Sequence, residues 1–122
     1  MRDAEENANE FAKRVIPLLK EFSEQFREKQ RTVMALQDQF FKIPDDERRS
    51  SEVAITLRDR LQALNGSIRS LDGAANRTSQ QVSQRLSHSE MDEVYKTILA
   101  LRLAEFDAER FAANSLASNI NL

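Results

Sequence analysis

Residues 8–43 read ANEFAKRVIPLLKEFSEQFREKQRTVMALQDQFFKI, and apolar side chains recur there at alternating intervals of four and three residues. Such spacing places every member of the series on one face of an α-helix. Only Lys29 interrupts the series with a polar side chain. The stretch therefore predicts a long helix with one buried stripe, made of Ala8, Ala12, Val15, Leu19, Phe22, Phe26, Lys29, Val33, Leu36, Phe40 and Ile43.

Two prolines act differently on this helix. Pro17 lies on the side away from the stripe, and the stripe continues through it, so we expect a bend and not an end. Pro44 ends the helix, because the residue before a proline is pushed out of the α region. The first helix is thus expected over about residues 3–43, and the acidic run that follows suits the first turn of a second helix.

The second helix is expected over about residues 46–86. Its stripe runs straight through Asn65 and Gly66, so a helix outweighs the hairpin turn that this pair favours between strands. Residues 76–84 are mostly Asn, Ser, Thr and Gln, which leaves open a second helix divided into two pieces. The predicted stripe is Ala54, Leu57, Leu61, Leu64, Ile68, Leu71, Ala75, Thr78 and Val82.

The third helix is expected over about residues 89–113, with a frayed tail over 114–122. Ser89 can cap its start while Asp92, three residues on, reaches back to the Ser89 amide. A box of Ser87 with Glu90 is the alternative.

Long helices also follow from the shortage of turn residues, since the 122 residues include only two glycines and two prolines. The connections are short, so neighbouring helices must be antiparallel. The predicted fold is all-α: one domain of three long antiparallel helices in a coiled-coil-like helical bundle.

Composition removes several classes of function. The net charge is only −2, from 18 Lys and Arg against 20 Asp and Glu, so nothing draws the chain toward nucleic acid or anionic lipid. No apolar run approaches the roughly 20 residues that span a bilayer. The chain has no cysteine and no visible secretory signal, and we expect a cytoplasmic protein.

Residues suited to catalysis are scarce. His88 is the only histidine, and it stands in a Ser-rich connection without the spacing of a metal site. Carboxylates fall at helix starts or beside Lys and Arg, where solvated charge is the usual role. We therefore expect no enzyme activity, no catalytic residue, no metal and no cofactor.

Apolar residues exceed what one stripe per helix needs. Met34 and Phe41 lie seven residues apart and roughly 130° from the stripe of the first helix, so they should face outward. The third helix has one stripe of Met91, Val94, Ile98, Leu101 and Ala108, and a second of Tyr95, Leu99, Leu103 and Phe106. Either its face is wide because it contacts two neighbours, or the second stripe binds a partner together with Met34 and Phe41.

The layout resembles the amino-terminal regulatory bundle of syntaxin-type SNAREs, the BAG domain of Hsp70 co-chaperones, spectrin repeats and bacterial secretion chaperones. No motif carries the resemblance to one family: residues 90–93 are Glu-Met-Asp-Glu where a BAG domain has an Arg-Lys pair, and the tryptophan of spectrin repeats is absent. The expected function is a non-catalytic protein–protein interaction domain, acting as adaptor, co-chaperone or assembly component through a helix–helix interface. The alternatives are a structural or oligomerisation element, including a homodimer, and a regulatory bundle of BAG-like or SNARE type.

Overall fold

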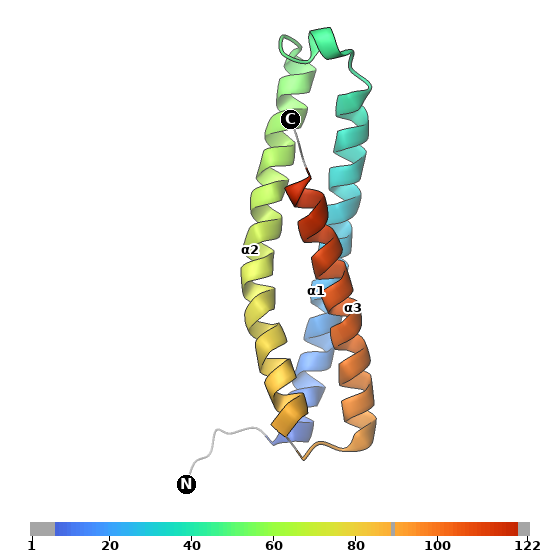
Figure 1. Cartoon of the computed structure of the whole chain (residues 1–122), viewed down its shortest axis with the longest axis vertical. Coiled ribbons are helices and arrows are strands. Elements are labelled where there is room, and N and C mark those ends of the chain that lie inside the picture. Colours follow the sequence, from blue (N-terminus) through green and yellow to red (C-terminus); the bar gives the residue numbers. More distant parts are fainter. Residues whose placement is uncertain (1–6, 89, 120–122) are drawn as a thin grey trace.

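The structure, a computed structural model, describes residues 7–88 and 90–119. Consecutive helices run antiparallel, so α1 and α3 point the same way and α2 runs opposite to both (Figure 1). Each helix packs against the other two. The predicted all-α bundle of three helices packed together is confirmed. Its elements are α1 (Ala8–Phe41), the 3-10 helix η1 (Asp45–Glu47), α2 (Glu52–His88) and α3 (Glu93–Ser118).

The start of α1 is fixed by a capping box. The Asn7 Oδ1 atom accepts from the Glu10 amide at 2.8 Å, and the Glu10 carboxylate accepts from the Asn7 amide at 3.2 Å. These bonds satisfy amides that have no partner within the helix. Because Asn7 is extended, the helix begins at Ala8, later than predicted; residues 1–6 lie outside the described part. The helix continues through Pro17, as expected.

The connection from α1 to α2 is longer than predicted. Pro44 leads into η1, and the chain turns again before α2 begins at Glu52 instead of near residue 46. The Ser51 hydroxyl accepts from the Ala54 amide at 3.3 Å and so caps the new helix. The acidic run therefore forms a separate turn, which the sequence pattern did not distinguish from a helix start.

The α2 helix is continuous from Glu52 to His88, which resolves the question of a division. Gly66 and Gly73 are both helical, and a Cβ atom added at either would meet nothing within 4 Å. The polar stretch 76–84 also stays helical. Packing of Ala75 and Val82 in the core compensates for weak local propensity there.

The start of α3 is set by α1. Its N-cap is Asp92, whose amide donates to Asn9 Oδ1 at 3.0 Å, while Asn9 Nδ2 donates to the Asp92 carboxylate at 3.1 Å. The predicted cap Ser89 lies outside the described residues. The alternative box is not formed, because Ser87 belongs to α2 and its hydroxyl donates to a backbone carbonyl of the preceding turn.

The end of α3 is longer than predicted. Residues 114–118, expected to fray, continue the helix. Ala117 is buried, Leu116 packs against the core, and Asn114 Nδ2 donates to Asp72 Oδ1 at 2.8 Å. Tertiary contacts therefore hold a stretch that is a weak helix former by itself.

The core follows the predicted stripes of α1 and α2 closely. Phe106 of α3 meets Phe22 and Phe26 of α1 edge to face, with ring centroids 5.6 and 6.4 Å apart. Lys29, the polar break in the first stripe, donates from Nζ to Ser67 Oγ of α2 at 2.7 Å. The fully buried large side chains are Phe26, Phe106, Leu19, Leu61, Ile68, Leu99, Val15, Val33 and Val82.

Several members of the predicted stripes are only partly buried. They include Ala8, Phe22 and Ile43 of the first stripe, and Leu71 and Leu64 of the second, although Leu64 was expected to be fully buried. Asp72 contacts Arg110 and Asn114, and α3 ends at Ser118, soon after this contact. Leu64 precedes Asp72 by about two helical turns, which puts it near the level at which α3 ends. Beyond this level α1 and α2 extend as a pair past the end of α3 (Figure 1).

Candidate helix-docking surface

The helix α3 carries an apolar surface on its solvent side. Leu101 is 63% exposed, Val94 68% and Phe111 74%. Between Glu93 and Phe111 the exposed positions include only three charged residues, all acidic. We define the α3 outer face as Val94, Ile98, Leu101, Ala104, Ala108 and Phe111.

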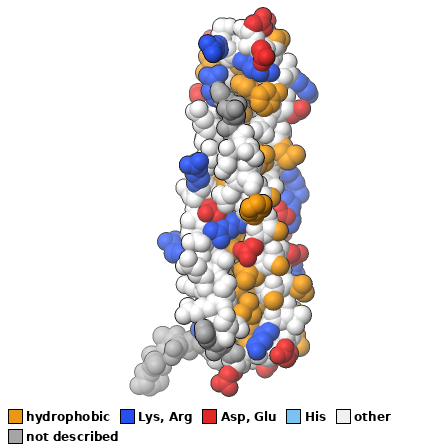
Figure 2. Space-filling view, in the orientation of Figure 1, with side chains coloured by type: hydrophobic (Ala, Val, Ile, Leu, Met, Phe, Trp, Pro, Cys, Tyr) orange, Lys and Arg blue, Asp and Glu red, His pale blue; other side chains and the backbone are white. Residues whose placement is uncertain are grey.

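The outward side of α2 is very different after its first turns, in which Val53 and Ile55 are exposed. From Asp59 to Gln84 its exposed positions carry polar or charged side chains, apart from Ala63 and two glycines. Apolar side chains gather along α3 in the space-filling view, where the neighbouring surface is mostly polar (Figure 2). Folding of the single chain does not require the α3 outer face, since these side chains contribute little buried area.

Two hollows lie in sequence along α3. The first, of about 310 Å³, is lined by Glu93, Val94, Thr97 and Ile98. The second, of about 280 Å³, is lined by Ile98, Leu101, Arg102 and Glu105. Residues at i, i+3, i+4 and i+7, as in the second, form the holes that receive a side chain from a facing helix. An ion pair of 2.9 Å between the last two residues forms one wall of it.

The four α3 residues predicted to bind a partner point inward. Leu99 and Phe106 are fully buried, while Tyr95 and Leu103 are partly buried against the core. The prediction that this stripe is a surface is wrong for Leu99 and Phe106, which close the three-helix core. Of the two explanations for the wide face of α3, contact with two neighbours accounts for this stripe.

Of the first predicted stripe, Met91 is buried, while Val94, Ile98, Leu101 and Ala108 are exposed. Ala104 and Phe111 belong to neither predicted stripe. Size is the signal that distinguishes the two stripes, because Phe106 and Tyr95 bury far more apolar area than Val94 and Ala108. The outer stripe also contains Glu105, three residues before Ala108. The structure buries the stripe with the larger side chains.

Met34 and Phe41 are exposed, as predicted, at 59% and 51%. Phe41 has a local role, because its ring lies 5.3 Å from that of Phe40 and the Arg48 guanidinium lies 5.0 Å from its centroid. Arg48 also donates to the carbonyls of Phe41 and Ile43, at 3.2 and 2.9 Å. Phe41 therefore helps to build the end of α1, and a partner-binding role for it and Met34 stays a prediction.

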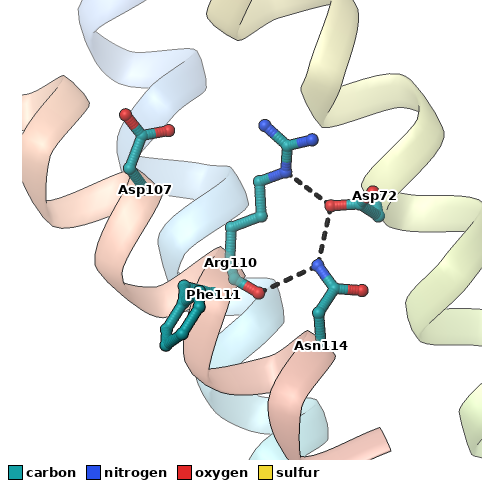
Figure 3. A pocket seen from close by; sticks show the side chains of 5 residues that line it. All are labelled: Asp72, Asp107, Arg110, Phe111 and Asn114. Atoms are coloured by element: carbon teal, nitrogen blue, oxygen red, sulfur yellow. Dashed lines mark hydrogen bonds and ion pairs between the residues drawn. The ribbon is translucent and has the colours of Figure 1, made fainter. Parts of the chain in front are cut away.

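A polar cluster joins α2 to α3 (Figure 3). Arg110 donates from Nε to Asp72 at 2.5 Å and from its terminal nitrogen to Asn76 at 3.0 Å. The hydrogen bond from Arg110 holds the pKa of the Asp72 carboxyl below its ordinary value. Asp107 and Phe111 line the hollow of about 310 Å³ beside the cluster, but Figure 3 shows their side chains turned away from Asp72. Both bonds from α3 end on the same oxygen, Asp72 Oδ1, so this carboxylate ties α2 and α3 together at one level.

In residues 7–88 and 90–119, no three His, Cys, Asp or Glu side chains come together as metal ligands would. The side chain of His88 lies outside the described part. No helix in the described part combines the length and the apolar character needed to cross a bilayer.

Comparison with known proteins assigns no family. No family model, no curated protein and no solved structure matches this chain.

Proposed function

We propose that this chain is a non-catalytic protein–protein interaction domain that receives a helix of another protein chain along the α3 outer face. The supporting observation is the contrast between the exposed sides of α2 and α3. A helix laid on α3 would bury Val94 and Leu101, and burial of apolar surface yields roughly 25 cal/mol per Å².

The chemistry of the occupant follows from that of the surface. Holes spaced by helical turns accept side chains at i, i+3, i+4 and i+7 of an amphipathic helix. An adaptor, a co-chaperone and an assembly component would each use such a surface. We propose a cytoplasmic location for the protein, because its sequence has no cysteine and no visible secretory signal. The polar cluster at Asp72 has a structural role in the proposal, because Arg110 and Asn114 of α3 both donate to its Oδ1 atom.

A photocrosslinking amino acid tests the proposal in cells that express the chain. Placed at Leu101 it lies on the α3 outer face, and placed at Gln62 it lies exposed on α2 as the matched control. We expect adducts from position 101 that are absent from position 62 and are lost when Val94→Glu is added. Equal adducts at both positions, or none at either, would contradict the proposal.

A further inference from the structure

The side of α2 that packs against α3 continues past the end of α3. Asp72 on this side contacts Asn114 of α3. Asn65 and Arg58 precede Asp72 by seven and fourteen residues, close to two and four helical turns, so they lie on the same side of α2. Seven residues rise about 10 Å, whereas α3 ends at Ser118, about 6 Å after Asn114. Asn65 therefore lies near the end of α3, and Arg58 lies beyond it.

The α1 helix repeats this arrangement with apolar side chains. Arg27 forms an ion pair of 2.9 Å with Glu109 of α3, which marks the side of α1 that packs against α3. Met34 and Phe41 follow Arg27 by seven and fourteen residues on that side, and more than half of each side chain is exposed. Figure 1 shows α1 and α2 continuing together past the end of α3. We define the α1–α2 end face as Met34 and Phe41 of α1 with Arg58, Asn65 and the exposed Ile55 of α2.

The polar side chains of the α1–α2 end face lack partners. Arg58 Nε and Asn65 Oδ1 are buried atoms without a hydrogen-bond partner among the described residues. Buried polar atoms in folded proteins nearly always have one, so these two atoms point to a group that another molecule supplies. Within the described part of the chain Arg58 also has no ion pair. Residues 55–71 of α2 contain three arginines and a single acidic residue, Asp59, so the charge here favours an acidic partner.

We infer that the α1–α2 end face binds an acidic amphipathic helix of another protein, which lies in line with α3. A helix suits this position, because α1 and α2 present side chains there at the same seven-residue spacing with which they contact α3. Its apolar side chains pack on Met34 and Phe41, and a carboxylate accepts from Nε and a terminal nitrogen of Arg58. From Asn65 back to Glu52 α2 rises about 20 Å, which about four turns of a partner helix cover. This surface is separate from the α3 outer face.

Two labelled synthetic helices of about four turns test the inference by fluorescence anisotropy. One has leucines along one face with glutamates beside them, and the other has lysine in place of each glutamate. Each is titrated with the parent, with Arg58→Ala and with the matched control Arg60→Ala, whose arginine lines a hollow on another side of α2 with Gln39 and Val53. We expect the acidic helix to bind the parent and Arg60→Ala alike, and to bind Arg58→Ala about tenfold more weakly. The lysine helix should bind none of them.

A bromoacetyl group on the acidic helix reports its position, because the chain has no cysteine of its own. It should alkylate Ile55→Cys and spare Val53→Cys, which is exposed two residues away on another side of α2.

Several results overturn the inference. They are equal binding of the acidic and lysine helices, equal binding of the acidic helix to Arg58→Ala and Arg60→Ala, and no binding of the acidic helix to the parent. Thermal melts of both variants exclude unfolding as the cause of weaker binding. Binding that requires deletion of residues 120–122 assigns the face to those residues, and a labelled copy of the chain that binds there instead assigns it to a second copy. Val94→Glu should leave binding unchanged, so a failure here leaves the proposed function standing.

Discussion

The outward sides of α2 and α3 face the same solvent from the same bundle, yet they differ in kind. Both helices bury an apolar stripe, and the burial of Leu61 and Ile68 in α2 matches that of Leu99 and Phe106 in α3. The inward stripes form the core, so folding requires them. Folding places no such requirement on the outward sides, so the apolar side of α3 points to association, and the polar side of α2 from Asp59 to Gln84 points to simple hydration.

The largest expected effect lies on the inward side of α3. Phe106→Ala should destabilise the fold by about 3–5 kcal/mol, because it removes a fully buried ring that contacts Phe22 and Phe26. Leu101→Ala, on the outward side, should change stability by less than about 0.5 kcal/mol. Urea denaturation of both variants measures the difference, and equal losses would show that the two stripes are assigned the wrong way round.

The next effect concerns the polar contact between α2 and α3. Asp72→Asn should cost about 1–3 kcal/mol, since it weakens a charge-assisted hydrogen bond to Arg110. Asp107→Asn is the matched control, because this neighbouring carboxylate is exposed and turned away. Similar melting temperatures for the two variants would show that the polar cluster does not hold α2 and α3 in register.

The same contact makes stability depend on pH. The folded pKa of Asp72 is below its unfolded value, so its contribution is complete above the unfolded pKa and is lost as pH falls through the folded pKa. Between about pH 5 and pH 2 the parent should therefore lose more stability than Asp72→Asn. Parallel losses in the two proteins, followed by denaturation at several pH values, would contradict this.

A smaller effect is expected on the outward side of α2. Gly66→Ala should stabilise the protein by up to about 1 kcal/mol, because alanine favours the helix more than glycine does. An added Cβ at Gly66 meets no atom within 4 Å. Association should not change, since α2 is hydrated. A loss of stability in thermal melts would mean that the helix is interrupted there.

The smallest effect on stability is expected on the α3 outer face. The double change Val94→Ser and Leu101→Ser should alter the free energy of unfolding of the monomer by less than about 0.5 kcal/mol. A dilute sample in urea gives this value without association. A loss of several kcal/mol would show that Val94 and Leu101 belong to the core, and the α3 outer face would then have no part in binding.

The sequence predicts the buried sides of the helices better than their exposed sides. The stripes of α1 and α2 are single, so their period identifies the buried side, including Phe26. The two stripes of α3 have the same period, so spacing does not distinguish them. Side-chain size is the one signal that does, and Phe106 turns inward to pack against Phe22 and Phe26. Spacing along one helix contains no information about which neighbour covers it.

The ends of the helices are also only partly predictable from the local sequence. The box of Asn7 with Glu10 is local, whereas the start of α3 depends on Asn9, a residue far away in the chain. The helical stretch 114–118 depends on Asp72 in the same way. Contacts between distant segments therefore account for the boundaries that were missed.

A photocrosslinking amino acid at Ile98, placed in the parent and in a variant that also carries Val94→Ser and Leu101→Ser, examines whether the apolar α3 outer face binds a helix of another protein chain. We expect adducts from the parent that the variant loses, while the melting temperature of the variant is unchanged. Adducts that persist in the variant, or a parent that forms none, would show that this face is not the binding surface.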